Sequence, residues 1–192
     1  MIPLNPPFRL ATEADAPQLA ELVNQAGHGL PLHIWTTLAD EGADPWEVGR
    51  ARQAQKAREG NVIVVDPGHG PVACLIGYGI DMKPEPIGED VPKLFRPLLE
   101  LENRAVDSWY VNVLACDPEH RGHGIGSRLL ELAEEIARSE CFARMSVITA
   151  DANQGARRLY TRHGYEQIDT LPSVTGEWET ETENWILLMK RL

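Results

Sequence analysis

Three glycines lie within five residues at the start of an amphipathic segment, in the stretch Arg121-Gly122-His123-Gly124-Ile125-Gly126. The N-terminus of a helix presents unpaired backbone N–H groups and the positive end of the helix dipole, so anions bind there readily. Glycines allow the backbone to approach a ligand closely, and Arg121 adds a permanent positive charge that suits a pyrophosphate. The stretch therefore predicts either a phosphate-binding loop or a tight turn without a ligand.

Two common nucleotide-binding motifs do not fit this stretch. The dinucleotide fingerprint of Rossmann folds requires a third glycine at position 127, which is Ser127. It also requires the glycines directly after a strand, whereas the residues from Cys116 to His120 intervene here. A nucleoside-triphosphate loop would end in lysine followed by serine or threonine, and this segment does not.

A second segment, NQGARRLYTRHGY at 153–165, decides between these readings, because the two segments together resemble the two signatures of the GNAT superfamily of N-acetyltransferases. The first signature, Arg/Gln-x-x-Gly-x-Gly/Ala, is filled by Arg121, Gly124 and Gly126. The second, Asn-x-x-Ala-x-x-Leu-Tyr-x-x-x-Gly-Phe, is matched with Tyr165 in place of phenylalanine, by Asn153, Ala156, Leu159, Tyr160 and Gly164. The resemblance covers most of residues 8–190 and favours the phosphate-binding loop.

The resemblance implies that acetyl-CoA is the co-substrate and that two parts of the chain bind it. Main-chain contacts to the diphosphate would come from Arg121, Gly122, His123, Gly124, Ile125 and Gly126. In the family the fourth strand splays from its neighbour at a bulge, and the backbone left free for the pantetheine arm would here belong to Leu114, Ala115 and Cys116. Asn153 would reach the pantetheine while capping its helix, and Tyr160 would direct its hydroxyl at the sulfur.

Acyl transfer to an amine requires a neutral amine and a proton for the departing thiolate. A phenol with an ordinary pKa near 10 can supply that proton, which makes Tyr160 the candidate acid, although its spacing alone fits a core residue equally. For the base we favour Glu102, at the expected entrance of the fourth strand. Glu100, Asp107 and Asn112 are further candidates there, and a glutamate at such a position is often only a solvated surface residue.

Hydrophobic periodicity predicts the elements that hold these residues. Helices are expected before Gly27, after Gly126, and at 32–39, 45–58 and 153–164. Strands are expected at 8–10, 61–66, 71–80, 107–116, 144–150 and 184–192. The stretch 81–107 reads as a loop with a short helix or an irregular crossing. The extra helical segment near residues 30–60 is expected to cover the acceptor end and to determine specificity.

Composition narrows the class of partner. The 192 residues carry a formal net charge of −11, which disfavours nucleic acid and anionic membranes and mildly favours cationic small molecules. No run approaches the roughly 18 apolar residues of a membrane span, and the chain does not begin with a signal-peptide pattern. Three cysteines without paired spacing argue against disulfides and zinc, so we expect no metal and a cytoplasmic location.

We therefore predict a single α/β (α+β) domain over residues 1–192, with a mixed, mostly antiparallel sheet of about seven strands flanked by helices. The expected activity moves an acetyl group from acetyl-CoA to a primary amine of a small molecule or peptide, by direct attack in a ternary complex. The alternative is a catalytically inactive module that binds or senses acyl-CoA. A homodimer is compatible with these features.

Overall fold

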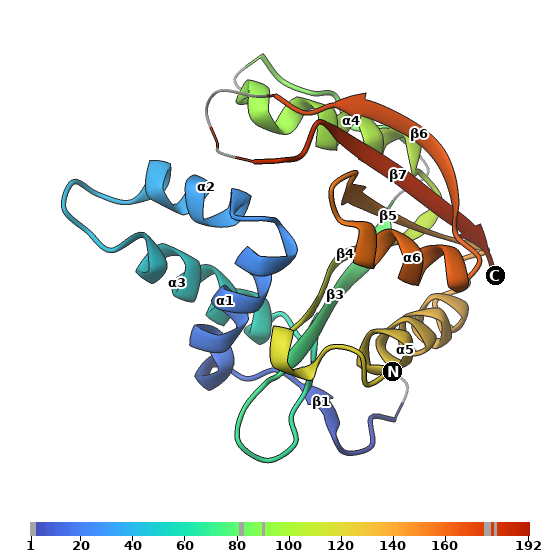
Figure 1. The fold of residues 1–192 in the computed structure, drawn as a ribbon, viewed down its shortest axis with the longest axis horizontal. Helices are drawn as coiled ribbons and strands as arrows, with labels where there is room; N and C mark the ends of the chain where they lie inside the picture. Colours follow the sequence, from blue (N-terminus) through green and yellow to red (C-terminus); the bar gives the residue numbers. More distant parts are fainter. Residues whose placement is uncertain (1–2, 81–82, 90, 175–177, 179) are drawn as a thin grey trace. The chain divides into compact units, whose positions relative to one another are not determined.

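The computed structural model describes residues 3–80, 83–89, 91–174, 178 and 180–192. Its strands are β1 (Phe8–Leu10), β2 (Val62–Val65), β3 (Ala73–Ile80), β4 (Ser108–Cys116), β5 (Arg144–Ala150), β6 (Glu166–Pro172) and β7 (Asn184–Arg191). They form one seven-stranded sheet in the order β1-β2-β3-β4-β5-β7-β6 (Figure 1). The β4–β5 pair is parallel, and the pairs β1–β2, β2–β3, β5–β7 and β6–β7 are antiparallel. The predicted mixed, mostly antiparallel sheet is thus confirmed.

Six α-helices occur in the described part of the chain. They are α1 (Ala16–Ala26), α2 (Leu30–Leu38), α3 (Pro45–Arg58), α4 (Arg96–Arg104), α5 (Ile125–Ser139) and α6 (Gln154–Arg162). The predicted extra helical segment near residues 30–60 corresponds to α2 and α3. The stretch 81–107 was expected to contain either a short helix or an irregular crossing, and it contains the helix α4.

The chain forms two compact units, which are described separately. The first unit holds residues up to Gly77 and Val113–Leu129, and the second holds Tyr78–Asn112 and Leu130–Leu192. The boundary between the units falls inside β3, β4 and α5, so each unit is built from separate stretches of sequence.

The first unit has its own apolar core between helices and strands. β2 is buried along its whole length, as expected for a strand of β-branched residues that is covered on both faces. The core side chains come mainly from α1, β2 and β3: Leu19, Leu22, Val62, Val64, Cys74 and Ile76. Each such burial contributes about 1.5–3 kcal/mol of hydrophobic stabilisation.

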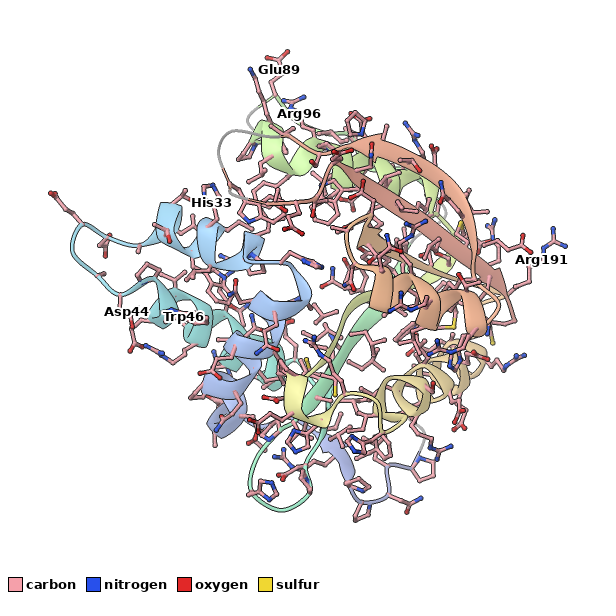
Figure 2. All side chains as sticks on the ribbon, in the orientation of Figure 1. His33, Asp44, Trp46, Glu89, Arg96 and Arg191 are labelled. Atoms are coloured by element: carbon pink, nitrogen blue, oxygen red, sulfur yellow. The ribbon has the colours of Figure 1, made fainter. Side chains whose placement is uncertain are left out.

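The helices of the first unit pack on one another. α2 packs against α3 through the buried Trp35, whose ring meets the Trp46 ring edge-on at 5.6 Å. Asp44 caps α3, since its carboxylate accepts a hydrogen bond from the Trp46 backbone N–H at 3.0 Å. Both residues are labelled in Figure 2. The indole rings of Trp35 and Trp46 therefore help to pack the extra helices α2 and α3 against each other.

The second unit places α4 against β5, β6 and β7. Leu101 of α4 is fully buried and anchors the helix, and Arg104 forms an ion pair with Asp169 of β6 at 2.5 Å. Because Leu101 is fixed in this way, the following residues of α4 are held in place as well.

The sequence analysis did not name β6. Its side chains are mostly exposed or half-buried because β6 is an edge strand of the sheet, and a bulge near Ile168 interrupts its alternation. A strand without a continuous apolar face gives little periodic signal.

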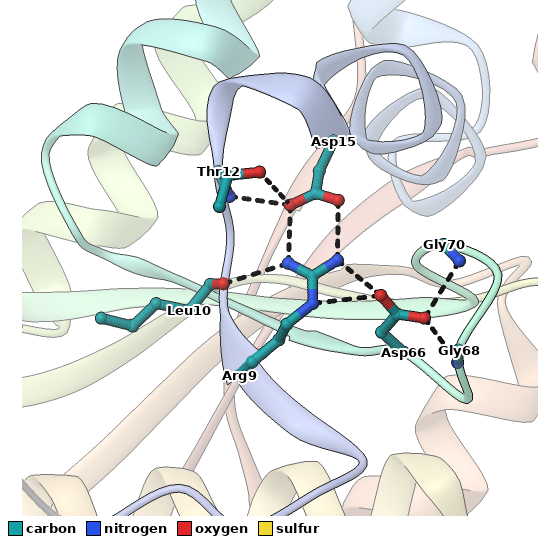
Figure 3. A network of polar contacts seen from close by, with 7 residues as sticks. All are labelled: Arg9, Leu10, Thr12, Asp15, Asp66, Gly68 and Gly70. Carbon is teal, nitrogen blue, oxygen red and sulfur yellow. Dashed lines mark hydrogen bonds and ion pairs between the residues drawn. The ribbon is translucent and has the colours of Figure 1, made fainter.

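A polar network around Arg9 ties the first unit together (Figure 3). The Arg9 guanidinium donates two hydrogen bonds to the buried Asp15, at 2.7 and 2.8 Å, and two to Asp66, at 2.7 and 3.1 Å. Asp66 also accepts hydrogen bonds from the backbone N–H groups of Gly68 and Gly70. The bonds to Arg9 are the main reason why the pKa of Asp66 falls to about 2 and that of Asp15 falls below its ordinary value.

We expect Arg9→Met to lower the free energy of unfolding by about 2 kcal/mol at pH 7, because it leaves the buried Asp15 without its cation. Both carboxyls have lowered pKa values, so their stabilisation is present above the ordinary value of 3.8 and disappears as the pH falls toward 2. The difference between Arg9→Met and wild type in urea unfolding should therefore shrink below pH 3.8. Arg50→Met, which breaks only surface pairs of α3, is the control and should change little.

Candidate functional site

The glycine-rich loop of the first unit has the geometry of an anion site. Gly122 and Gly124 have φ values of +81° and +80°, and a Cβ atom added to either would meet no atom within 4 Å. The two glycines are therefore required by the backbone conformation and not by packing. α5 begins directly after Gly124, at Ile125, so its first N–H groups and its dipole face this loop.

The Arg121 side chain crosses back to the end of β4. Its Nε donates a hydrogen bond to the Cys116 carbonyl at 2.9 Å. The terminal nitrogens Nη1 and Nη2 take no part in this bond. Arg121 itself is exposed. The bond fixes the guanidinium beside the loop, where it can add charge to the backbone donors.

His28, in the turn between α1 and α2, lies close enough to Arg121 to be influenced by it. Burial, together with the positive charge of Arg121, lowers the pKa of the His28 imidazole. Its backbone is in the left-handed region, with φ +53°, beside Gly29 at φ +84°. The sequence analysis did not single out His28, because His28 is distant from the loop in the sequence and comes close to Arg121 only in the folded chain.

The residues that were predicted to follow the pantetheine arm, Leu114, Ala115 and Cys116, form the end of β4 in the first unit. The parallel pairs with β5 that the structure describes run from Trp109 with Met145 to Val111 with Val147. Ala115 is buried, and the Cys116 carbonyl accepts the hydrogen bond from Arg121. A splayed backbone at this end of β4 and its contact with a ligand stay predictions.

The second signature forms α6 in the second unit. Asn153 caps the helix, since its Oδ1 accepts a hydrogen bond from the Ala156 backbone N–H at 3.1 Å. Tyr160 is 4% exposed, and burial raises the pKa of its phenol. Its hydroxyl therefore remains protonated at neutral pH, as a proton donor requires.

Glu102 does not stand at a strand entrance, as the sequence suggested, but in the last turn of α4. The reason is that the run from Arg96 to Arg104 has apolar residues at helical spacing, with Leu101 buried against the sheet. Burial and, to a smaller extent, the negative charge of Glu85 raise the pKa of the Glu102 carboxyl to about 7. Among the described residues no lysine or arginine forms an ion pair with it.

Two tyrosines accompany Glu102 in the second unit. The rings of Tyr78 and Tyr110 meet edge to face, with centroids 5.5 Å apart. Burial first, and the negative charge of Glu102 second, raise the pKa of both phenols. The Asn112 side chain opposes the shift of Tyr110 by a hydrogen bond, and Tyr160 adds to it. Glu102 and Tyr160 thus each raise the pKa of Tyr110, whereas the raised pKa of Tyr160 itself is caused by burial.

The other candidate bases are engaged elsewhere. Glu100 is exposed and forms an ion pair with Arg104 at 3.8 Å. Asp107 is also exposed and forms an ion pair with Arg144 at 3.1 Å. Of the three carboxylates considered, Glu102 alone is half-buried and without an ion pair in the described part of the chain.

Sequence reasoning missed Tyr78 and Glu85 and gave Tyr110 no role. Tyr78 is the last aromatic residue of β3, Glu85 is in the loop that follows, and Tyr110 is in β4. A partial signal was present, because a polar ring in an otherwise apolar strand usually finds a polar partner. The identity of that partner required the fold.

The cysteines near the loop are protonated thiols. Burial raises the pKa of Cys74 to about 12 and, with an opposing effect of Arg121, raises that of Cys116. A thiol in this state is a poor nucleophile. Neither cysteine is therefore prepared to accept an acetyl group.

The described residues contain neither of two other kinds of site. Within them, no three His, Cys, Asp or Glu side chains are grouped as ligands for a metal ion. No described helix has the length and apolar character needed to cross a membrane.

Comparisons with known proteins indicate one protein family. A model described as the acetyltransferase (GNAT) family matches residues 32–165. A comparison with curated proteins finds no match.

Solved structures with the same fold include three N-acetyltransferases. One is a ribosomal-protein-alanine N-acetyltransferase from Brucella melitensis, with TM-score 0.62 and 24% identity over 96% of this chain and 99% of that chain. The others are a polyamine N-acetyltransferase from Drosophila melanogaster, with TM-score 0.67 and 18% identity, and a mosquito protein described as arylalkylamine N-acetyltransferase like 5b, with TM-score 0.67 and 16% identity. Each of these two alignments covers 96% of this chain and 99% of the other.

Proposed function

We propose a specific reaction on the premise that this chain belongs to the acetyltransferase (GNAT) family, whose model covers residues 32–165. As a member of that family the chain is an acyltransferase that uses acetyl-CoA as its donor. The reaction that we propose is direct transfer of the acetyl group to the nitrogen of a primary amine. The observation that carries it is the half-buried carboxylate of Glu102, which forms no ion pair in the described part of the chain and whose pKa is raised by burial to about 7.

The first unit binds the donor in this proposal. Backbone N–H groups of residues 121–126 and the Arg121 guanidinium hold the diphosphate, and the backbone from Leu114 to Cys116 holds the pantetheine arm. The conformations of Gly122 and Gly124 support this role, because their open surroundings leave room for a ligand against the backbone.

Glu102 and Tyr160 of the second unit move the protons. An alkylammonium loses a proton to the Glu102 carboxylate, which is ionised above pH 7. The neutral nitrogen then forms the new C–N bond to the acetyl carbon as the C–S bond breaks. The departing thiolate takes its proton from the Tyr160 hydroxyl, whose raised pKa keeps it protonated until then. The acylated nitrogen then loses its second proton to the Tyr160 phenolate, which restores the phenol, and Glu102 releases its proton to solvent. The products are the N-acetylated amine and free CoA thiol.

The state of the thiols supports a ternary complex. An acetyl-enzyme would require a nucleophilic side chain, and Cys74 and Cys116 are held as thiols by their raised pKa values. Initial rates measured against both substrates should therefore give intersecting reciprocal plots. Mass spectrometry of enzyme mixed with acetyl-CoA alone should find no acetylated protein.

The experiment that tests the function is an acetylation assay on a panel of amines, read out by released CoA thiol and by mass spectrometry of the product. We expect thiol release that depends on the amine and is matched by N-acetylated product. Binding of acetyl-CoA without any amine-dependent release would instead support a module that only binds or senses acyl-CoA.

Gly124→Ala should weaken the binding of acetyl-CoA by about tenfold, because an alanine at φ +80° costs about 1–2 kcal/mol and the loop relaxes by turning its N–H groups. Calorimetric titration with acetyl-CoA measures this. Gly60→Ala is the matched control, since Gly60 has φ +76° and equally open surroundings at the end of α3. An equal loss of affinity in both variants would mean that general destabilisation, and not the loop, is responsible.

A further inference from the structure

We propose that Lys190 and Glu134 form a positioning pair for catalysis, which holds the end of α6 and the Tyr165 ring and thereby directs the Tyr160 hydroxyl. The inference rests on the proposed function, because it concerns the proton donor of that reaction. It is carried by a series of direct contacts within the second unit, which leads from the Lys190 ammonium to the Tyr160 ring.

The Lys190 ammonium meets three partners. Lys190 lies near the end of β7, and its side chain is only 12% exposed. Its Nζ forms an ion pair with the Glu134 carboxylate of α5 and donates a hydrogen bond to the His163 carbonyl at 2.9 Å. The same Nζ lies over the Tyr165 ring, 5.6 Å from its centroid, which is within the range of a cation–π contact. The ammonium thus joins β7 to α5 and to the end of α6.

The end of α6 is the part of this assembly that carries the Tyr160 backbone. His163 is the C-cap of α6, and its N–H and the N–H of Tyr165 both donate to the Tyr160 carbonyl at 3.0 Å. Gly164, with φ +81°, lets the chain turn back at this point. A cation at the C-terminal end of a helix also interacts favourably with the helix dipole. Lys190 therefore fixes the turn to which the Tyr160 backbone is hydrogen-bonded.

The Tyr165 ring carries the same constraint to the Tyr160 side chain. Tyr165 is held by the Lys190 ammonium over its ring and by the bond from its hydroxyl to the Met145 sulfur at 3.7 Å. Its ring packs against that of Tyr160, with centroids 5.6 Å apart and planes at 60°. Burial raises the pKa of Tyr160, and no hydrogen bond from a described residue contributes to the shift. The ring and the helix that carries it therefore set the direction of the hydroxyl.

Stability is a poor explanation for an ion pair at this place. β7 is apolar from Trp185 to Met189, so an apolar residue at position 190 would continue the strand. Exchanging a largely buried ion pair for apolar side chains of similar volume is often neutral or stabilising, because the two charges no longer have to be removed from water. What the pair adds is one fixed arrangement of its neighbours. A proton donor depends on such an arrangement, since small displacements lower the rate strongly.

The test is the double variant Lys190→Met/Glu134→Leu, which removes both charges and keeps apolar volume. We expect kcat with the best amine of the panel to fall by about 10–100-fold. The affinity for acetyl-CoA in calorimetry should stay nearly unchanged, and the melting temperature should not fall below that of wild type. In the Tyr160→Phe background the same two substitutions should lower kcat by no more than about twofold, because the hydroxyl that they position is already absent.

Arg144→Met is the matched control. Arg144 also pairs with a carboxylate, that of Asp107 at 3.1 Å, and donates to a carbonyl, that of Val106 at 3.2 Å. Both bonds are made to the segment just before β4, in the same unit as Lys190. Arg144→Met should therefore keep kcat within a few-fold of wild type.

The proposal is overturned if the double variant retains the wild-type kcat, or if it loses the same factor with and without the Tyr160 hydroxyl. A loss of folded protein would lower kcat equally in both backgrounds, so the second comparison separates positioning from stability. Either result leaves the proposed function standing when Tyr160→Phe itself lowers kcat. A wild-type kcat in Tyr160→Phe would instead contradict the proposed role of Tyr160, and the positioning role with it.

Discussion

Tyr160→Phe should lower kcat by about 10²–10³-fold and leave the affinity for acetyl-CoA nearly unchanged. The substitution removes one hydroxyl and retains the buried ring, so the packing of α6 is preserved. Without the phenol, the departing thiolate has no positioned proton donor in this proposal. Steady-state kinetics with the best amine of the panel and calorimetry with acetyl-CoA provide the two measurements.

Tyr165→Phe is a close control for this variant. The Tyr165 ring lies 5.6 Å from that of Tyr160, is 3% exposed, and also has a phenol with a pKa raised by burial. Its hydroxyl donates to the Met145 sulfur at 3.7 Å, which gives it a structural partner. Tyr165→Phe should therefore keep kcat within a few-fold of wild type. A similar fall in both variants would remove Tyr160 from the mechanism.

Glu102→Gln should remove the acidic limb of the pH–rate profile and lower the plateau by about 10²-fold. In wild type, kcat/KM should rise with pH until Glu102 is ionised and should level off above its pKa of about 7. Glutamine cannot accept the proton, so the variant should lack that rise. Glu100→Gln, on the same helix and exposed, should retain the wild-type profile. Persistence of the limb in Glu102→Gln would exclude Glu102 as the base.

The same raised pKa predicts a stability effect that does not depend on substrate. The folded state binds the Glu102 proton more tightly than the unfolded state, whose carboxyl has an ordinary pKa of 4.5. The contribution of Glu102 is therefore fully favourable below pH 4.5 and is lost as the pH rises through about 7. Relative to Glu102→Gln, wild type should lose on the order of 1–3 kcal/mol of unfolding free energy between pH 4.5 and pH 8. Urea unfolding at the two pH values measures this difference.

Local patterns predicted both signature segments and most of the elements, although not β6. The helical periodicity of 45–58 predicted α3, and the apolar run that ends at Cys116 predicted β4, because both patterns are formed by residues close together in the sequence. The neighbourhood of Glu102 could not be predicted in this way. Its environment is set by Tyr78, Glu85 and Tyr110, which come from three other segments and meet only in the fold.

The error over Glu102 has a related cause. The stretch that includes Leu101 and Glu102 fits a helix or an irregular crossing, and only burial of Leu101 against the sheet decides for the helix. The glutamate was therefore assigned to the wrong element, although it was chosen as the base. That choice, the role of Tyr160 and the cofactor contacts remain predictions for the experiments above.

The passage of β3, β4 and α5 through both compact units has a practical consequence for dissecting this protein. The breaks fall after Gly77, Asn112 and Leu129, each within a continuous strand or helix. Any fragment that ends at one of these positions would carry a severed element and expose its unpaired backbone. The proposed donor-binding and acceptor-binding functions must therefore be separated by point substitutions in the intact chain, because truncation would damage both.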